Sequence, residues 1–202
     1  MKDKNRELLW VVDCQHDFMD ADGKLYVEGA EDIKSNLKKV MDDFKDHSIV
    51  FTQDWHYYDS EELSTEPDFV NTFPEHCMAG TIGADLIDEV KPDHYDLIVN
   101  WDQKLSRIGL NNTIIERFNI LLRKDKFDFV SGNSNSKQFL ALLLDKFDKV
   151  YVVGVAGNVC VNQAVLGLKD YFEVTVIENA ISDLPNIPSC VENWKNMGIE
   201  VI

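Results

Sequence analysis

Short apolar runs rich in valine and isoleucine alternate with longer segments of helical period along most of the chain. Runs of this length and composition predict strands buried on both faces, and the 3.6-residue period predicts amphipathic helices. The predicted strands are 8–13, 48–54, 97–99, 120–122, 150–155, 174–179 and 199–202, of which 97–99 and 120–122 have the weakest pattern. The predicted helices are 30–46, 158–171 and 187–197.

Strands interleaved with helices in this way predict an α/β fold of three layers, α/β/α, with a mostly parallel central sheet. We expect one domain over residues 1–202, because a chain of this length can bury a substantial single core. Residues 55–95 have weak periodicity and should be mostly loop. In such folds ligands bind beyond the carboxyl ends of the strands, and several polar residues fall there.

Composition excludes some functions. No stretch approaches the roughly 20 apolar residues that span a bilayer, and the charged N-terminus lacks the apolar core of a signal peptide, so we expect a cytoplasmic protein. The formal net charge is −16, from 36 acidic and 20 basic residues. A surface of this charge repels phosphate backbones and anionic lipids, which argues against nucleic-acid and membrane partners.

One of the four cysteines has an unusual position. Cys160 follows a Gly-Val-Ala-Gly turn at 154–157 and should lie in the first turn of a helix. Backbone N–H groups and the helix dipole there favour a thiolate and can hold an oxyanion. The same segment is equally compatible with a packed cysteine in an ordinary βα unit.

A nucleophilic cysteine needs a base, and none of the five histidines has an obvious triad context. Asp13 closes an apolar strand, so we expect burial to raise its pKa and to suit it to accepting a proton. Lys124 follows the run at 120–122 and could hold charged neighbours in place. Taken separately, Asp13 also suits a turn cap, and Lys124 also suits a solvated surface position.

A second constellation consists of Asp54, His56 and His76. Asp54 and His56 are two residues apart at a strand end, so their side chains should point the same way. With a third imidazole from a loop they form a set of one oxygen and two nitrogen ligands, which suits a divalent transition metal. Without further support, this spacing is weak evidence for a metal.

Five distinctive segments occur in order along the chain: VVDCQHDF (11–18), TQDWH (52–56), FPEHCMAGTIGADL (73–86), LLRKDKFDFVSGN (121–133) and GVAGNVCV (154–161). Together they resemble the isochorismatase-like hydrolase superfamily, in particular its nicotinamidase branch. The third segment is the most diagnostic, because branches of the superfamily without a metal generally lack it.

The resemblance implies a role for each matching residue. Cys160 would be the nucleophile, Asp13 the proton carrier and Lys124 their electrostatic partner. A cis peptide would precede Ala156, and the N–H groups of Ala156 and Cys160 would form the oxyanion hole.

The resemblance also implies that Asp54, His56 and His76 ligate a divalent ion, most often zinc and otherwise iron or manganese. Phe18 and Phe73 would offer flat faces to an aromatic substrate. Gln15 is expected to be structural, with its amide bonded to the backbone.

The chain departs from the family pattern at three places. Ser60 occupies the position of a further histidine in many nicotinamidases, so the fourth metal ligand is open between Glu62, Glu66 and water. Phe73 stands where tryptophan is usual. Residues 94–118 resemble an insertion that could alter oligomer contacts or cover the pocket, and relatives suggest a homo-oligomer.

The predicted function is a metal-dependent cysteine amidohydrolase that converts nicotinamide to nicotinate and ammonia through a thioester. Alternatives are hydrolysis of a different small amide, cleavage of an isochorismate-like ether, and a non-catalytic role in ligand binding. The metal-ligand pattern argues against the ether, and retention of nucleophile, base and lysine argues against loss of catalysis.

Overall fold

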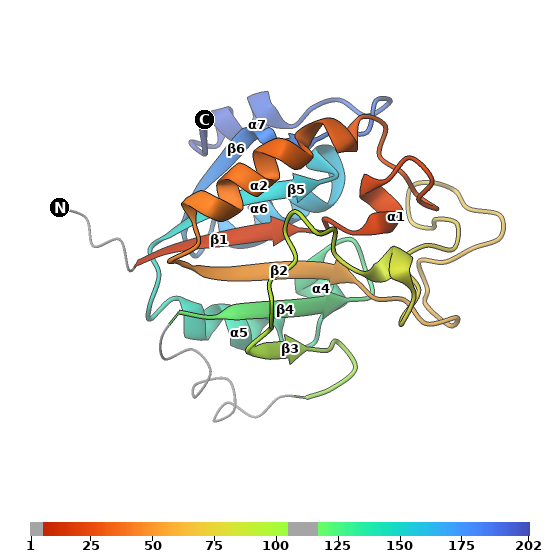
Figure 1. Cartoon of the computed structure of the whole chain (residues 1–202), viewed down its shortest axis with the longest axis horizontal. Helices are drawn as coiled ribbons and strands as arrows, with labels where there is room; N and C mark the ends of the chain where they lie inside the picture. Colours follow the sequence, from red (N-terminus) through yellow and green to blue (C-terminus); the bar gives the residue numbers. More distant parts are fainter. Residues whose placement is uncertain (1–5, 105–116) are drawn as a thin grey trace.

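A single parallel sheet forms the centre of the molecule, as seen in the computed structural model, which describes residues 6–104 and 117–202. Within these residues the strand order is β3-β4-β2-β1-β5-β6-β7, and every neighbouring pair is parallel. The strands are β1 (Glu7–Val12), β2 (Ser48–Asp54), β3 (Leu97–Val99), β4 (Asn119–Lys124), β5 (Lys149–Val155), β6 (Glu173–Ser182) and β7 (Glu200–Val201). The chain therefore begins near the middle of the sheet and extends to both edges (Figure 1).

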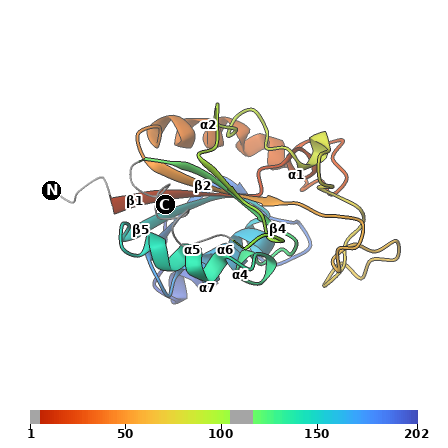
Figure 2. The same cartoon turned by 90° about the horizontal axis from the view of Figure 1, so that it is seen from below.

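Helices cover both faces of this sheet, which confirms the predicted three-layer α/β/α architecture. The helix α2 (Lys34–Asp43) lies on one face (Figure 2). On the other face lie α4 (Phe129–Gly132), α5 (Ser136–Leu143), α6 (Asn162–Leu168) and α7 (Val191–Asn196). Shorter helical segments are α1 (His16–Met19), η2 (Ala30–Ile33), η3 (Ile82–Ala84) and η4 (Gly157–Val161).

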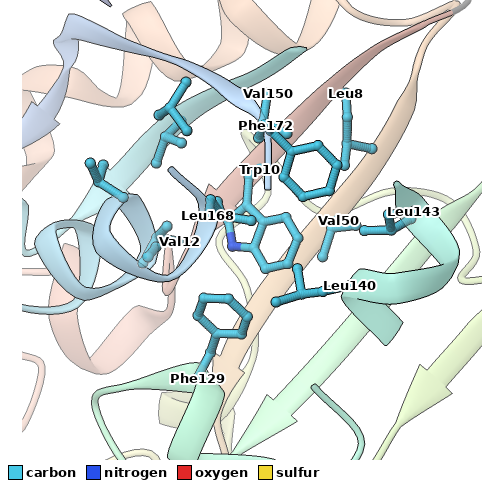
Figure 3. Packing of buried hydrophobic residues seen from close by; sticks show 14 of the residues in the cluster. Leu8, Trp10, Val12, Val50, Phe129, Leu140, Leu143, Val150, Leu168 and Phe172 are labelled. Carbon is cyan, nitrogen blue, oxygen red and sulfur yellow. The ribbon is translucent and has the colours of Figure 1, made fainter. Parts of the chain in front are cut away.

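Strand β1 explains why the apolar runs are continuous rather than alternating. Leu8, Trp10 and Val12 belong to the core under α5 and α6, whereas Leu9 and Val11 belong to the core under α2. Successive side chains of a strand point to opposite faces, so a strand covered on both faces must be apolar throughout. Trp10 is fully buried, with its ring centroid 5.0 Å from that of Phe129 (Figure 3).

The predicted strands are confirmed to within a few residues, but the helices differ more. The predicted helix 30–46 is a 3-10 segment followed by α2, and 158–171 is η4 followed by α6. The predicted helix 187–197 begins only at Val191, because Pro188 disfavours helical backbone at the residue before it. The helices α1, α4 and α5 were not predicted.

Residues 55–95 contain one short 3-10 helix, η3, and otherwise turns and bends. Much of this loop extends beyond the carboxyl ends of the strands (Figure 1). Of the predicted insertion at 94–118, residues 105–116 lie outside the described part of the chain. In the described ranges, no helix is both long enough and apolar enough to cross a membrane.

Candidate active site and metal centre

Four polar residues meet at the carboxyl ends of four adjacent strands. Asp13 directly follows β1, and Asp54 and Lys124 are the last residues of β2 and β4. Asp54 and Lys124 are register partners in the sheet, so strand pairing alone brings them side by side. Cys160 lies in η4, immediately after β5. The fold thus brings together at one edge four residues that are each at least 36 positions apart in sequence.

The turn that carries Cys160 depends on an unusual backbone. Gly154 has φ of +119°, and a Cβ there would lie 2.0 Å from the carbonyl oxygen of Val12, so only glycine fits. The Val155–Ala156 peptide is cis. The carbonyl of Ala156 accepts hydrogen bonds from the N–H groups of Val159 and Val161, both at 3.0 Å. Cys160 therefore lies in a π-helical turn rather than the regular first helical turn that the sequence suggests.

Lys124 is buried between two carboxylates. Its Nζ lies 2.9 Å from Oδ2 of Asp13 and donates a hydrogen bond to Oδ1 of Asp54. The other oxygen of Asp13 accepts a hydrogen bond of 2.7 Å from the hydroxyl of Thr52. All three charged side chains are at most 2% exposed. One buried ammonium therefore forms ion pairs with two buried carboxylates.

Because two carboxylates share one ammonium, the pKa values of the two aspartates shift in opposite directions. Burial opposes ionisation of Asp54, but Lys124 and the nearby histidines hold its pKa well below the usual range. Burial raises the pKa of Asp13, Lys124 offsets part of this effect, and the charge of Asp54 adds to it. Burial alone would lower the pKa of Lys124, but Asp13 and Asp54 raise it well above normal. Asp13 is therefore the acid that takes up a proton more readily.

Cys160 is close to both aspartates. Its Sγ and one carboxylate oxygen from each of Asp13 and Asp54 lie within 4.8 Å of one another. Burial raises the pKa of the Cys160 thiol well above its usual value; Lys124 offsets part of this effect, and the charges of Asp13 and Asp54 add to it. The expectation of a thiolate favoured by a helix end is therefore wrong for this environment. The resting form is a thiol with a proton acceptor beside it.

Asp54, His56 and His76 are buried and form a second group that shares Asp54 with the first. Their ligand atoms lie within 4.8 Å of one another, and Oδ2 of Asp54 is 3.9 Å from Nε2 of His56 and 3.8 Å from Nε2 of His76. Nδ1 of His76 donates to the carbonyl of Pro74 at 2.8 Å, so Nε2 is the nitrogen that faces Asp54. Burial lowers the pKa of this ring, but the hydrogen bond and charge of Asp54 raise it above its usual value. Both imidazoles therefore direct a nitrogen toward the same carboxylate.

A divalent cation fits this arrangement. Nε2 of His56 is buried without a hydrogen-bond partner among the residues that the structure describes. An unpaired buried polar nitrogen is costly, and ligation of a metal ion would satisfy it. Burial lowers the pKa of His56 to about 4, so the ring is neutral and free to ligate at neutral pH. Its Nδ1 is 3.0 Å from the hydroxyl of Ser60, which orients the ring.

The structure separates the two candidates for a fourth ligand. Glu66 is exposed, whereas Glu62 is buried beside the site. Both oxygens of Glu62 accept the N–H of Phe127, at 3.1 Å each. Burial raises the pKa of Glu62 to about 7, and the charge of Asp54 adds to the effect. Glu62 therefore lines the pocket, and its carboxylate already accepts a hydrogen bond from the backbone of Phe127.

Cys160 and two of the proposed metal ligands, Asp54 and His76, line one pocket of about 680 Å³. Phe18 and Phe73 both line it, as the sequence suggests, with ring centroids 5.5 Å and 6.2 Å from that of His76. Ala156 and Cys160 line it as well, on the side of the π-helical turn. An aromatic ring in this pocket would lie within reach of both constellations.

Several supporting residues were not predicted. Thr52 holds Asp13, and its only signal is a hydroxyl within an apolar strand. The carboxylate of Asp17 accepts the N–H of Cys77 at 2.6 Å, which fixes the segment after His76. Gln15 is confirmed as structural. Its side-chain amide donates to the carbonyl of Asp54 and accepts the N–H of the same residue.

A buried cysteine, aspartate and lysine at the carboxyl edge of a parallel α/β/α sheet is the arrangement of a cysteine hydrolase. The chain belongs to the Isochorismatase family, whose domain matches residues 7–200. This match confirms the predicted family.

Individual relatives narrow the comparison. The nicotinamidase of Saccharomyces cerevisiae is 29% identical over 224 residues, covering 96% of this chain and 98% of the yeast protein. The pyrazinamidase of Pyrococcus horikoshii in complex with zinc has a TM-score of 0.69 at 23% identity, covering 98% of each chain. PnC1 from L. infantum in complex with nicotinate has a TM-score of 0.71 at 22% identity, covering 98% of this chain and 92% of that one. The two structures show the shared fold.

Proposed function

We propose that the protein is a metal-dependent cysteine amidohydrolase and that it hydrolyses nicotinamide to nicotinate and ammonia. The observation that carries this proposal is the clustering of Cys160, Asp13 and Lys124 with Asp54 and the two histidines. Of these residues, Cys160, Asp54 and His76 line one pocket. Similarity to the yeast nicotinamidase over nearly the whole of both chains supports the choice of substrate.

In the proposed reaction, Asp13 takes the proton from the Cys160 thiol as the sulfur attacks the amide carbon. The N–H groups of Ala156 and Cys160 would hold the oxyanion of the tetrahedral intermediate. Asp13 then gives the proton to the leaving nitrogen, the C–N bond breaks, and ammonia departs. Water, activated by the same carboxylate, hydrolyses the thioester and restores the thiol. The raised pKa of Asp13 suits both directions of transfer.

Lys124 would act by its charge rather than by giving up a proton. Its pKa is raised well above the usual value, so it stays an ammonium throughout. It holds Asp13 and Asp54 in fixed positions through the contacts at Oδ2 and Oδ1. As Asp13 becomes protonated and the sulfur becomes negative, the same ammonium stabilises the new charge.

Asp54, His56 and His76 would hold the divalent ion, with zinc the first choice and iron or manganese the next. When bound, the ion supplies a Lewis acid to which a pyridine nitrogen can bind. Phe18 and Phe73 would flank the ring. The zinc complex of the archaeal relative supports the choice of metal. Cytoplasmic location and a homo-oligomer stay predictions.

The decisive measurement is ammonia release from nicotinamide by the purified protein, before and after chelation and again after adding back Zn²⁺, Fe²⁺ or Mn²⁺ separately. We expect chelation to abolish release and one of the ions to restore it. Release that survives complete removal of metal would contradict the metal dependence. Absence of release from metal-loaded, folded protein would contradict nicotinamide as the substrate.

A further inference from the structure

The pocket changes character from its base to its mouth. At the base, Asp54 and His76 are each 2% exposed and Cys160 is 8% exposed. At the mouth, Phe69 is 62%, Val70 69% and Ile187 40% exposed, although all three line the same pocket. Apolar side chains gathered around an opening are a common mark of a ligand-binding surface.

The pocket is also larger than the proposed substrate requires. Its volume of about 680 Å³ lies well within the range of roughly 300 to 1,000 Å³ that is typical of sites for drug-sized ligands. Nicotinamide is a single ring with one carboxamide group. With the carboxamide at Cys160 and the ring near His76, the space between Phe69 and Ile187 would hold only water.

The first wall of the mouth is the turn 68–72, which is held by hydrogen bonds to the carboxylate of Asp68. One oxygen of Asp68 accepts the N–H groups of Val70, Asn71 and Thr72 at 2.9, 2.8 and 2.8 Å. Phe69 has φ of +55°, a backbone conformation that costs a bulky residue energy. Hydrogen bonds inside the turn thus hold Phe69 and Val70 at the opening rather than letting them fold away.

The second wall is attached to the turn that carries the nucleophile. Nδ2 of Asn158 donates to the carbonyls of Leu184 and Ile187 at 2.9 and 2.8 Å, and its Oδ1 accepts the N–H of Leu184 at 3.0 Å. Asn158 is two residues before Cys160 in η4 and is buried. The segment 184–187, apolar except for Asn186, therefore has a fixed place relative to the reacting sulfur.

From these observations we infer that the mouth is an apolar subsite and that the protein prefers aromatic carboxamides with an apolar substituent beyond the ring. The polar base would take the carboxamide and ring, and the substituent would lie between Phe69 and the segment 184–187. This inference rests on the proposed amidase function and deepens it by naming the substrate class.

The test compares nicotinamide with its 5-phenyl and 6-phenyl derivatives as substrates of the metal-loaded protein. We expect kcat/KM for at least one phenyl derivative to exceed that for nicotinamide by about tenfold, because discrimination in apolar pockets is typically of this order or larger. Phe69→Ala and Ile187→Ala should each reduce this preference severalfold. Tyr58→Ala is the matched control, because Tyr58 is an aromatic residue of the same loop that is 89% exposed and does not line the pocket.

The outcomes distinguish the two proposals. Turnover of nicotinamide without preference for either phenyl derivative would overturn the subsite and leave the amidase standing. No turnover of any of the three amides would overturn the amidase and the subsite with it. A preference unaffected by Phe69→Ala, together with a changed sedimentation coefficient of that variant, would assign the mouth to contact with a second copy and overturn the subsite.

Discussion

The two sides of the polar cluster differ in how completely the protein itself satisfies them. On the nucleophile side, formed by Asp13 and Cys160, Oδ1 of Asp13 accepts a hydrogen bond from Thr52, and Oδ2, which has no hydrogen bond within the described ranges, lies 2.9 Å from the ammonium of Lys124. On the metal side, formed by Asp54, His56 and His76, Nε2 of His56 has no hydrogen bond within the same ranges, and Oδ2 of Asp54 is 3.9 Å away. The buried charge on the first side is thus paired within the protein, whereas a cation would be needed to pair the imidazole on the second. Lys124 contacts both.

The largest expected effect isolates the nucleophile side. Cys160→Ala should reduce kcat for amide hydrolysis by roughly 10⁴-fold or more, because removing a nucleophile eliminates the covalent route. Metal content should stay unchanged, because Sγ is not one of the three proposed ligands. Elemental analysis and steady-state kinetics on the same preparation check both points. Substantial turnover by the variant, or loss of its metal, would contradict the division into two sides.

The residue shared by both sides should show the next largest effect. Lys124→Met leaves Asp13 and Asp54 buried without their cation, so the free energy of unfolding should fall by about 3–5 kcal/mol. Urea denaturation measures this loss. Lys126→Met is the matched control, because the partly exposed Lys126 forms an ion pair with the exposed Glu61, and such pairs contribute about 0–1 kcal/mol. Equal losses in the two variants would refute the special role of Lys124.

The pH dependence of stability tests the environment of Glu62, which is buried beside the metal side. Its pKa rises from the usual 4.5 to about 7, so the folded state keeps a proton that the unfolded state loses between these values. The stabilisation from this group is complete below about pH 4.5 and disappears as pH rises through 7. Glu62→Gln, which keeps an oxygen for Phe127, should therefore gain about 3 kcal/mol relative to wild type between pH 4.5 and 8.

Thermal or urea unfolding of both proteins in chelator, at several pH values, gives this difference directly. A constant difference across the range would show that Glu62 ionises normally. Glu66→Gln provides the comparison, because Glu66 is an exposed carboxyl group of the same loop.

The smallest expected effect concerns the orientation of a metal ligand. Ser60→Ala removes the hydroxyl 3.0 Å from Nδ1 of His56, and loss of such a partner typically weakens metal binding by about tenfold or somewhat more. Competition with a chelator of known affinity measures the change. Ser64→Ala is the control, since the hydroxyl of Ser64 accepts the exposed N–H of Glu66 in the same loop. An unchanged affinity in Ser60→Ala would show that the ring needs no such support.

Much of the framework could be predicted from sequence because continuous apolar runs leave strands little freedom. Strand ends then locate Asp13, Asp54 and Lys124 at one edge. The short helices α1 and α4 escape prediction because four residues carry too little periodicity. The missed α5 does carry a signal, since Phe139, Leu140 and Leu143 recur at helical spacing and are buried.

Other features depend on tertiary contacts that spacing does not encode. Sequence suggests a thiolate at Cys160, but the direction of its pKa follows from burial and from two carboxylates on other strands. The choice between Glu62 and Glu66 likewise depends on which one the loop buries. The sequence identifies which ionisable groups the site contains, but their protonation states depend on burial and on charges that only the folded chain brings near.

The strand order also determines when the site is completed during synthesis. Strand β1 is translated first and lies between β2 and β5. A nascent chain that has emerged through residue 148 contains Asp13, Lys124 and the three proposed metal ligands, but the edge of β1 that pairs with β5 is still bare. The strand that covers this edge is the one that leads into Cys160. The reactive thiol therefore arrives together with the strand that closes the sheet.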